Sequence, residues 1–256
     1  MLQCPVRDCQ LALVRDGRRL VCSKNHSFDV SRSGYINLLQ PQERRSKTPG
    51  DTPAAVAGRR RIHDRGVTAP LLAAISQMAQ PTTSDIVLDA GCGEGFYLGS
   101  LASQTAFDAH GADISIPAID AAARRYPACE WIVTNADRAL PYQPQSFSLI
   151  LSITARMNPT EFQRVIRPGG RLLVAIPAPG DLIELRGAGR DRTARTIETF
   201  AQAFTLTAQT RITTAAELDP TALEDVLHSI YRPLSQNPPA MRVTFSLDLL
   251  HFLANS

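Results

Sequence analysis

From residue 85 onward, short apolar runs alternate with longer stretches in which apolar side chains recur every three or four residues. Short runs bounded by turn residues are typical of buried strands, and the longer spacing is typical of helices that bury one face, as at residues 69–79. The expected strands cover residues 86–88, a segment ending near 111, and residues 130–134, 147–152, 172–176 and 241–253. Such alternation indicates an α/β fold, a parallel sheet with helices on both faces, and the final strand would complete a sheet of seven.

The first 65 residues follow a different pattern. Leucines and a valine flank Asp16 and Gly17, a dipeptide that favours a tight hairpin turn. In the stretch that follows, apolar side chains could pack the hairpin against the main domain or stack on an unpaired base, and we favour packing. The side chains concerned are Phe28, Tyr35, Ile36, Leu38 and Leu39. We therefore divide the chain into a ribbon at residues 1–39, an exposed basic linker at 40–65 that leads into a helix, and a main domain at 66–256.

The composition is that of a folded globular protein, with 256 residues of which 44% are apolar and 20% charged. These values exclude intrinsic disorder of the whole chain. The first residues lack the apolar core of a secretory signal, and no apolar run reaches membrane-spanning length. We expect a cytoplasmic protein with no membrane contact. The five cysteines, three of them within the first 22 residues, favour metal binding over a disulfide framework.

The charge is distributed unevenly along the chain. Residues 1–65 carry 13 lysines and arginines against 6 acidic residues, a net charge of +7, whereas the whole chain has +3. A basic excess of this kind suits a surface that faces nucleic-acid phosphates, although a solvated basic surface is the simpler alternative.

Cys4, Cys9, Cys22 and His26 form two pairs of soft ligands at the ends of the expected hairpin. Zinc in proteins prefers four nitrogen or sulfur ligands in a tetrahedron, and each pair must lie a few residues apart to reach one ion. The alternative is a chance grouping of three buried cysteines and a surface histidine. We favour a zinc ribbon, with a structural role because four protein ligands leave no position for water.

Residues 89–95 (DAGCGEG) directly follow the strand at 86–88. Glycines allow the backbone to approach a ligand closely, and the start of the next helix offers amide donors. Asp113 follows Gly95 by 18 residues, at the end of the second strand, where a carboxylate can accept hydrogen bonds from ribose hydroxyls. The sequence therefore predicts a nucleotide cofactor bound across the carboxyl ends of the strands.

These motifs resemble those of class I S-adenosylmethionine-dependent methyltransferases, which the loop at 135–136 and residues 167–170 (RPGG) also match. The N-terminal ligands, residues 34–39 (GYINLL) and residues 47–51 (KTPGD) are similar to one family in particular. It is the family of bacterial 23S ribosomal RNA guanine-N1 methyltransferases, which includes enzymes that confer resistance to macrolide antibiotics such as tylosin. The resemblance implies a Rossmann-like sheet, S-adenosylmethionine as cofactor, structural Zn²⁺, and a 23S ribosomal RNA hairpin as partner.

The resemblance also implies which residues hold the cofactor. Asp113 would bind the ribose, and Asn135 and Ala136 would lie beside adenine, with Asp137 as the alternative contact. The full expected set is Thr68, Asp89, Gly91, Gly93, Glu94, Gly95, Phe96, Asp113, Ile114, Asn135, Ala136 and Asp181. The chain departs from the family where Thr68 and Asp181 replace a tyrosine and a histidine, and where four residues instead of two separate Cys4 from Cys9.

Methyl transfer to guanine N1 requires a group that accepts the N1 proton. Asp181, after the fifth strand, is the candidate catalytic base, although it could simply line the cofactor cavity. Residues 184–192 are expected to form a mobile, basic loop over the substrate. The residues expected to contact RNA are Arg44, Arg45, Lys47, Arg59 and Arg60.

Two alternative functions stay open. The chain could be a zinc-containing RNA-binding protein that has lost turnover, or a small-molecule methyltransferase whose ribbon forms a homodimer contact. The glycine turn together with Asp89 and Asp113 argues against the first, and the basic N-terminal region argues against the second.

Overall fold

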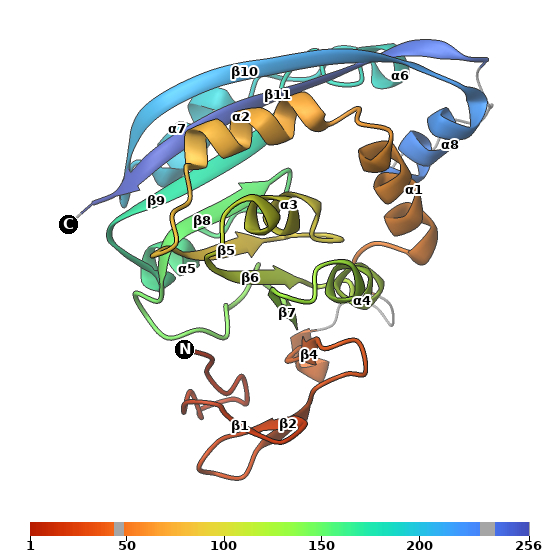
Figure 1. The fold of residues 1–256 in the computed structure, drawn as a ribbon. Helices are drawn as coiled ribbons and strands as arrows, with labels where there is room; N and C mark the ends of the chain where they lie inside the picture. The colour runs from red at the N-terminus through yellow and green to blue at the C-terminus, as the bar shows by residue number, and fades with distance from the viewer. Residues whose placement is uncertain (44–48, 231–238, 256) are drawn as a thin grey trace.

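A computed structural model describes residues 1–43, 49–230 and 239–255. Its main element is a sheet of eight strands in the order β10-β11-β9-β8-β5-β6-β7-β4 (Figure 1). The strands from β4 to β9 pair in parallel, whereas β11 runs antiparallel to both β9 and β10. The strands are β4 (Ile36–Asn37), β5 (Ile86–Ala90), β6 (Asp108–Asp113), β7 (Glu130–Val133), β8 (Phe147–Ile153), β9 (Ile166–Pro177), β10 (Phe204–Leu218) and β11 (Met241–Ala254).

The predicted α/β architecture is confirmed, with two additions. Six strands were predicted by their ranges, in a sheet expected to hold seven, and the observed sheet has eight. One addition is β4, from the segment after the N-terminal hairpin, which pairs with β7 at the sheet edge. The long edge strand β10 was not predicted, although β11 was. Residues 167–170 (RPGG) belong to β9, which begins before the range predicted for the fifth strand.

Helices cover both faces of the sheet, and the apolar pattern explains why. Adjacent residues Val87 and Leu88 of β5 are both fully buried, one in each of the two core clusters. A central strand buried on both sides reads as a continuous apolar run. One face packs against α2 (Ala69–Ala79), α3 (Phe96–Gln104) and α4 (Ile116–Arg125), and the other against α5 (Pro159–Val165) and α7 (Thr193–Phe200).

The N-terminal ribbon lies beside the β4–β7 edge of the sheet (Figure 1). It is a three-stranded antiparallel sheet of β1 (Val14–Asp16), β2 (Arg19–Val21) and β3 (Ser27–Asp29). Its buried residues belong to the same apolar cluster as the sheet, and the Gln3 N–H donates to the Pro141 carbonyl over 2.9 Å. Ile36, Leu38 and Leu39 are buried, as the packing alternative predicted.

A third apolar cluster lies between α1 (Pro53–Asp64), α6 (Ile183–Arg186) and α8 (Pro220–Ser229). Helices α1 and α8 lie side by side (Figure 1), where Gly58 allows close approach and Arg61 donates to Asp225 over 2.9 Å. The α1 helix begins at Pro53, so much of the expected linker is helical. A short 3-10 helix, η1 (Pro41–Glu43), precedes it. In the described part of the chain, no helix combines the length and apolarity needed to cross a membrane.

Candidate active site

A cavity of about 1040 Å³ lies at the carboxyl ends of the parallel strands. This edge is where open α/β sheets bind ligands, because the loops that follow each strand converge there. Most of the expected cofactor residues line the cavity. They are Thr68, Asp89, Gly91, Gly93, Glu94, Phe96, Asp113, Ile114, Asn135, Ala136 and Asp181.

The turn after β5 follows the cavity wall through left-handed backbone. Gly91, Gly93 and Gly95 have φ angles of 86°, 55° and 77°. A Cβ on Gly91 would lie 2.3 Å from the Cβ of Ala155, so no larger residue fits there. Gly95 does not line the cavity; it caps α3, and a Cβ on it would lie 2.4 Å from the Trp131 ring. The glycines therefore shape this wall by close packing as well as by backbone conformation.

Asp89 places a buried carboxylate at the end of β5. Its side chain is 1% exposed, and its Oδ1 atom has no hydrogen-bond partner within the described residues. Burial, together with the charges of Asp113 and Glu94, raises the pKa of Asp89 to about 8. A buried oxygen without a partner at a cavity wall is a site that a polar or cationic ligand group can satisfy.

Asp113 lies opposite, at the end of β6. Its Oδ2 accepts a hydrogen bond from the Gly93 N–H over 3.0 Å, and its Oδ1 accepts one from the Ser115 N–H over 2.8 Å. Burial raises the pKa of Asp113, against the lowering effect of these two amides. Each carboxylate oxygen keeps a further lone pair, so both can still accept ligand hydroxyls.

The loop after β7 provides a third part of the wall. Ala136 lines the cavity beside Asn135, whose side chain accepts from the Asp137 N–H over 3.1 Å and donates to the Glu43 carbonyl over 3.3 Å. Asp137 pairs with Arg156 at 3.3 Å. The side-chain amide of Asn135 therefore holds the loop in shape.

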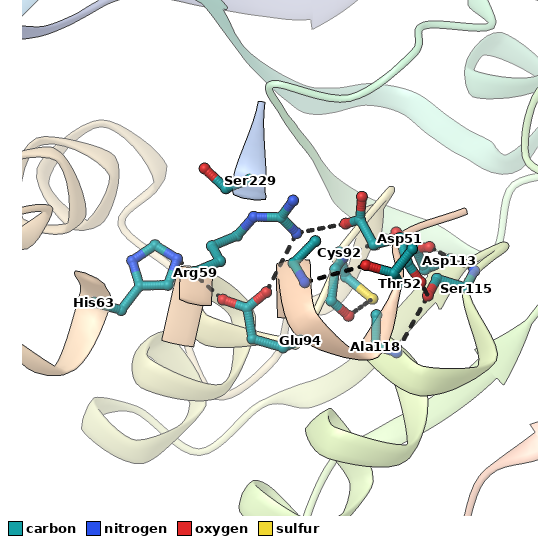
Figure 2. Close-up of polar contacts among 12 residues, drawn as sticks. Asp51, Thr52, Arg59, His63, Cys92, Glu94, Asp113, Ser115, Ala118 and Ser229 are labelled. Atoms are coloured by element: carbon teal, nitrogen blue, oxygen red, sulfur yellow. Dashed lines mark hydrogen bonds and ion pairs between the residues drawn. The ribbon is translucent and has the colours of Figure 1, made fainter. Parts of the chain in front are cut away.

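A polar network that the sequence did not predict closes the cavity from the side of α1. Figure 2 shows Arg59 between Asp51 and Glu94, with His63 on the other side of Glu94. The Arg59 guanidinium lies 2.7 Å from Asp51 and 3.5 Å from Glu94, and His63 Nε2 lies 3.0 Å from Glu94 Oε1. Burial alone would raise the pKa of Glu94, but the contacts with His63 and Arg59 lower it. Glu94 is thus held as a carboxylate.

The same network explains the positions of Thr68 and Phe96. His63 Nδ1 lies 2.6 Å from Thr68 Oγ1, and the His63 ring stacks on Phe96 with centroids 4.0 Å apart. The sequence carried one signal for this group: Arg59 and His63 are four residues apart and therefore share one face of a helix. The approach of Arg59 and His63 to the glycine turn depends on how α1 packs, so their spacing in the sequence could not predict it.

Asp181 lies after β9 and is 8% exposed. Its Oδ1 accepts the Ser246 N–H over 2.9 Å, and its Oδ2 accepts from Arg186 over 2.5 Å. Burial raises the pKa of Asp181, against the Ser246 amide and the Arg186 charge. Both oxygens already hold neighbouring segments together, which any role in proton transfer must accommodate.

The expected RNA-binding residues separate in the structure. Arg44, Arg45 and Lys47 lie outside the described residues. Arg59 was predicted to lie in an exposed basic linker. In the structure it lines the cavity instead, where two carboxylates hold it. Arg60, its neighbour, is exposed and lies 3.7 Å from Asp64.

The four N-terminal ligands come together in the ribbon. The ligand atoms of Cys4, Cys9, Cys22 and His26 all lie within 4.8 Å of one another. The Cys9 and Cys22 sulfurs are 3.8 Å apart, and His26 Nδ1 lies 3.3 Å from the Cys4 sulfur. Two sulfurs bound at ~2.3 Å in a tetrahedral zinc site lie ~3.8 Å apart, so the donor set fits this ion.

Two family models match separate parts of the chain. A zinc-ribbon model described as "RlmA, N-terminal" matches residues 2–47, and a model described as "Methyltransferase domain" matches residues 87–173. A Streptomyces fradiae protein named 23S rRNA (guanine(748)-N(1))-methyltransferase is 35% identical over 238 residues. That match covers 88% of this chain and 83% of the relative.

Solved structures share the fold at low identity. One solved structure is a complex between the Haloferax volcanii Trm112 methyltransferase activator and a methyltransferase. This chain is similar to one chain of that complex, with a TM-score of 0.57 and 20% identity. The match covers 81% of this chain and 99% of the other. The [4+2]-cyclase SpnF matches with a TM-score of 0.53 and 16% identity, covering 72% of this chain and 80% of that chain. Because a protein named as a cyclase shares this fold, the fold alone does not assign a reaction.

Proposed function

The chain belongs to the family of 23S rRNA guanine-N1 methyltransferases, and from this membership we propose that it transfers a methyl group from S-adenosylmethionine to N1 of a guanine in a 23S rRNA hairpin. One observation carries the proposal. The 35% identity to the Streptomyces fradiae enzyme covers 88% of this chain, and the zinc-ribbon model matches residues 2–47. A likeness confined to the methyltransferase region would support the fold but not the RNA substrate.

The cavity residues suit the cofactor chemically. S-adenosylmethionine, when bound, supplies an activated methyl group on a positively charged sulfur. Asp89 has a free buried oxygen for a cationic group, and Asp113 keeps lone pairs for the ribose hydroxyls. Gly91 and Gly93 line the cavity between these two carboxylates with backbone alone, and Ala136 offers an apolar surface for adenine.

The target base must leave its stacked position for N1 to reach the methyl group. As the new N–C bond forms and the S–C bond breaks, N1 loses its proton to a base or to water. Most of the required work is alignment, which a rigid cavity wall provides. Asp181 stays our candidate for the proton acceptor; its raised pKa suits that role, whereas its contacts to Ser246 and Arg186 also suit a positioning role.

Other parts of the proposal rest on sequence alone. We propose that the basic N-terminal region, including Arg60, contributes to RNA affinity, with the zinc ribbon positioned to hold the RNA. Ribosomal RNA as substrate would place the enzyme in the cytoplasm. A homodimer also stays a prediction, which the molar mass of the protein in solution would test.

Mass spectrometry of 23S rRNA tests the function directly. We expect rRNA from cells that carry the protein to contain one additional N1-methylguanine, absent when the gene is deleted. Purified protein with S-adenosylmethionine should introduce the same mark into an unmodified 23S transcript. An unchanged modification map in both tests would contradict the proposal. Failure to bind S-adenosylmethionine in calorimetry would favour an RNA-binding protein without turnover.

A further inference from the structure

Besides Arg186, which is paired with Asp181, three exposed arginines line the cavity together with the glycine turn. Arg156 lies in the loop after β8, and Arg190 and Arg192 lie between α6 and α7. We call these three residues the arginine rim. None of them was among the residues predicted to contact RNA, although Arg190 and Arg192 fall within residues 184–192, the basic loop that was expected over the substrate.

The cavity has opposite charges in its two parts. Asp89, Glu94 and Asp113 form the carboxylate end, beside the glycine turn. The arginine rim faces the same space with positive charge. A ligand with a cationic centre suits the carboxylate end, and a polyanion suits the rim. The two parts of this cavity therefore suit ligand groups of opposite charge.

The rim arginines are available for an anion, unlike the other arginines of the cavity. Within the residues that the structure describes, Arg190 and Arg192 form no ion pair. Arg156 is 77% exposed, so water weakens its contact with Asp137. By contrast, Arg59 is neutralised by two carboxylates, and Arg186 is held by Asp181.

The backbone around Arg190 and Arg192 is fixed to the cavity wall. The Gly189 N–H donates to the Pro179 carbonyl over 2.7 Å. Arg186 donates to both the backbone carbonyl and the carboxylate of Asp181, over 3.1 Å and 2.5 Å. These bonds join the loop to the segment after β9, so the rim positions are set by the same strand end that carries Asp181.

We propose that Arg190 and Arg192, with Arg156, bind the phosphates that flank the guanine in the cavity. The inference rests on the proposed RNA substrate and assigns its phosphate contacts to residues near the reacting base. Contacts of this kind position the strand without reading its sequence. Arginine suits the task because its fork of N–H donors matches two phosphate oxygens.

Salt-dependent RNA binding tests the proposal. The test variant is Arg190→Ala/Arg192→Ala, and the matched control is Arg167→Ala/Arg195→Ala, which removes the same charge from exposed positions that do not line the cavity. The probe is an unmodified 23S rRNA transcript. We expect the test variant to bind it at least about tenfold more weakly at low salt. The slope of log affinity against log salt should fall by about 1.5 to 2, the loss of two phosphate contacts.

Three further measurements separate the possible outcomes. Affinity for S-adenosylmethionine should stay unchanged in both variants, and Arg190→Lys/Arg192→Lys should restore most of the salt slope. If the native protein methylates the transcript but the test variant keeps its RNA affinity and slope, the rim proposal alone is overturned. If the native protein binds S-adenosylmethionine but neither binds nor methylates the transcript, the proposed function fails, and the rim proposal with it.

Discussion

The carboxylate end and the arginine rim of the cavity are built in different ways. At the carboxylate end, two strand ends and a glycine turn hold the buried Asp89 and Glu94 together with Asp113, which accepts hydrogen bonds from two backbone amides. At the rim, two loops present exposed arginines. A buried, close-packed wall cannot yield to an added atom, whereas an exposed charge acts over a distance and tolerates small displacements. The first end should therefore be sensitive to shape, and the second to charge and salt.

The largest effect is expected for Gly91→Ala, which tests shape at the carboxylate end. The new Cβ would lie 2.3 Å from that of Ala155, at a φ angle of 86°. We expect cofactor affinity to fall by about 100-fold or more, because the turn must move out of the wall. Gly169→Ala is the matched control, since its φ is 69° and nothing lies within 4 Å of the added atom. Equal cofactor affinities of the two variants in calorimetry would contradict the role of close packing at Gly91.

Asp89→Asn tests charge at the same end and should weaken cofactor binding by about 10- to 150-fold, the cost of losing a charged hydrogen bond. Because the pKa of Asp89 is raised to about 8, the free protein carries a protonated Asp89 at lower pH. Cofactor affinity of the native protein should therefore rise as pH increases from about 6 to about 7. The Asn variant should lose this dependence. A native affinity that is flat with pH would remove Asp89 as the contact for a cation.

Arg59 and Arg60, adjacent on α1, test whether the position of a charge or the net charge affects cofactor binding. Arg59→Gln should weaken cofactor binding by about tenfold, because Glu94 and Asp51 lose a shared partner beside the glycine turn. Arg60→Gln removes the same charge from an exposed position and should leave cofactor affinity within about twofold. Calorimetry on both variants compares them directly. Similar losses in the two would mean that net charge, and not position, is responsible.

The smallest effect is expected for Asp181→Asn, which loosens the rim. Its contact with Arg186, a side chain 40% exposed, is partly screened by water. If Asp181 positions the loop, the KM for RNA should rise by about three- to tenfold while the pH profile of kcat keeps its shape. If Asp181 is the catalytic base, kcat should instead fall by about 100-fold or more and its low-pH limb should vanish. Steady-state kinetics across pH distinguish the two roles.

The sequence predicted those site residues that lie in one short segment, but not those that reach the cavity through helix packing. Asp89 and the glycines could be predicted because a strand, a turn and a helix start lie within one short segment. The zinc ligands could be predicted as well, because they form two pairs that are local in the sequence. Arg59 and His63 reach the cavity only through the packing of α1 against α8, which no local pattern encodes.

The missed strand has a related cause. Residues of β10 alternate between exposed and half-buried along most of its length, because it lies at the edge of the sheet. Its many threonines and alanines therefore give no strong apolar period. Strand β4 is only two residues long, and its pairing with β7 joins segments almost a hundred residues apart. Only the assembled sheet shows such contacts.

The pairing of β4 with β7 sets the distance between the ribbon and the cavity. Ile36 and Asn37 pair with Ile132 and Val133, and the Leu38 N–H donates to the Val133 carbonyl over 2.9 Å. Two residues beyond Val133 the chain enters the cavity wall at Asn135. The ribbon is thus joined to the strand whose end leads into the cavity wall, and this connection sets the distance between the two. If the ribbon holds RNA as we propose, the enzyme would select an RNA by the spacing between its ribbon-bound segment and its reactive base, as well as by its sequence.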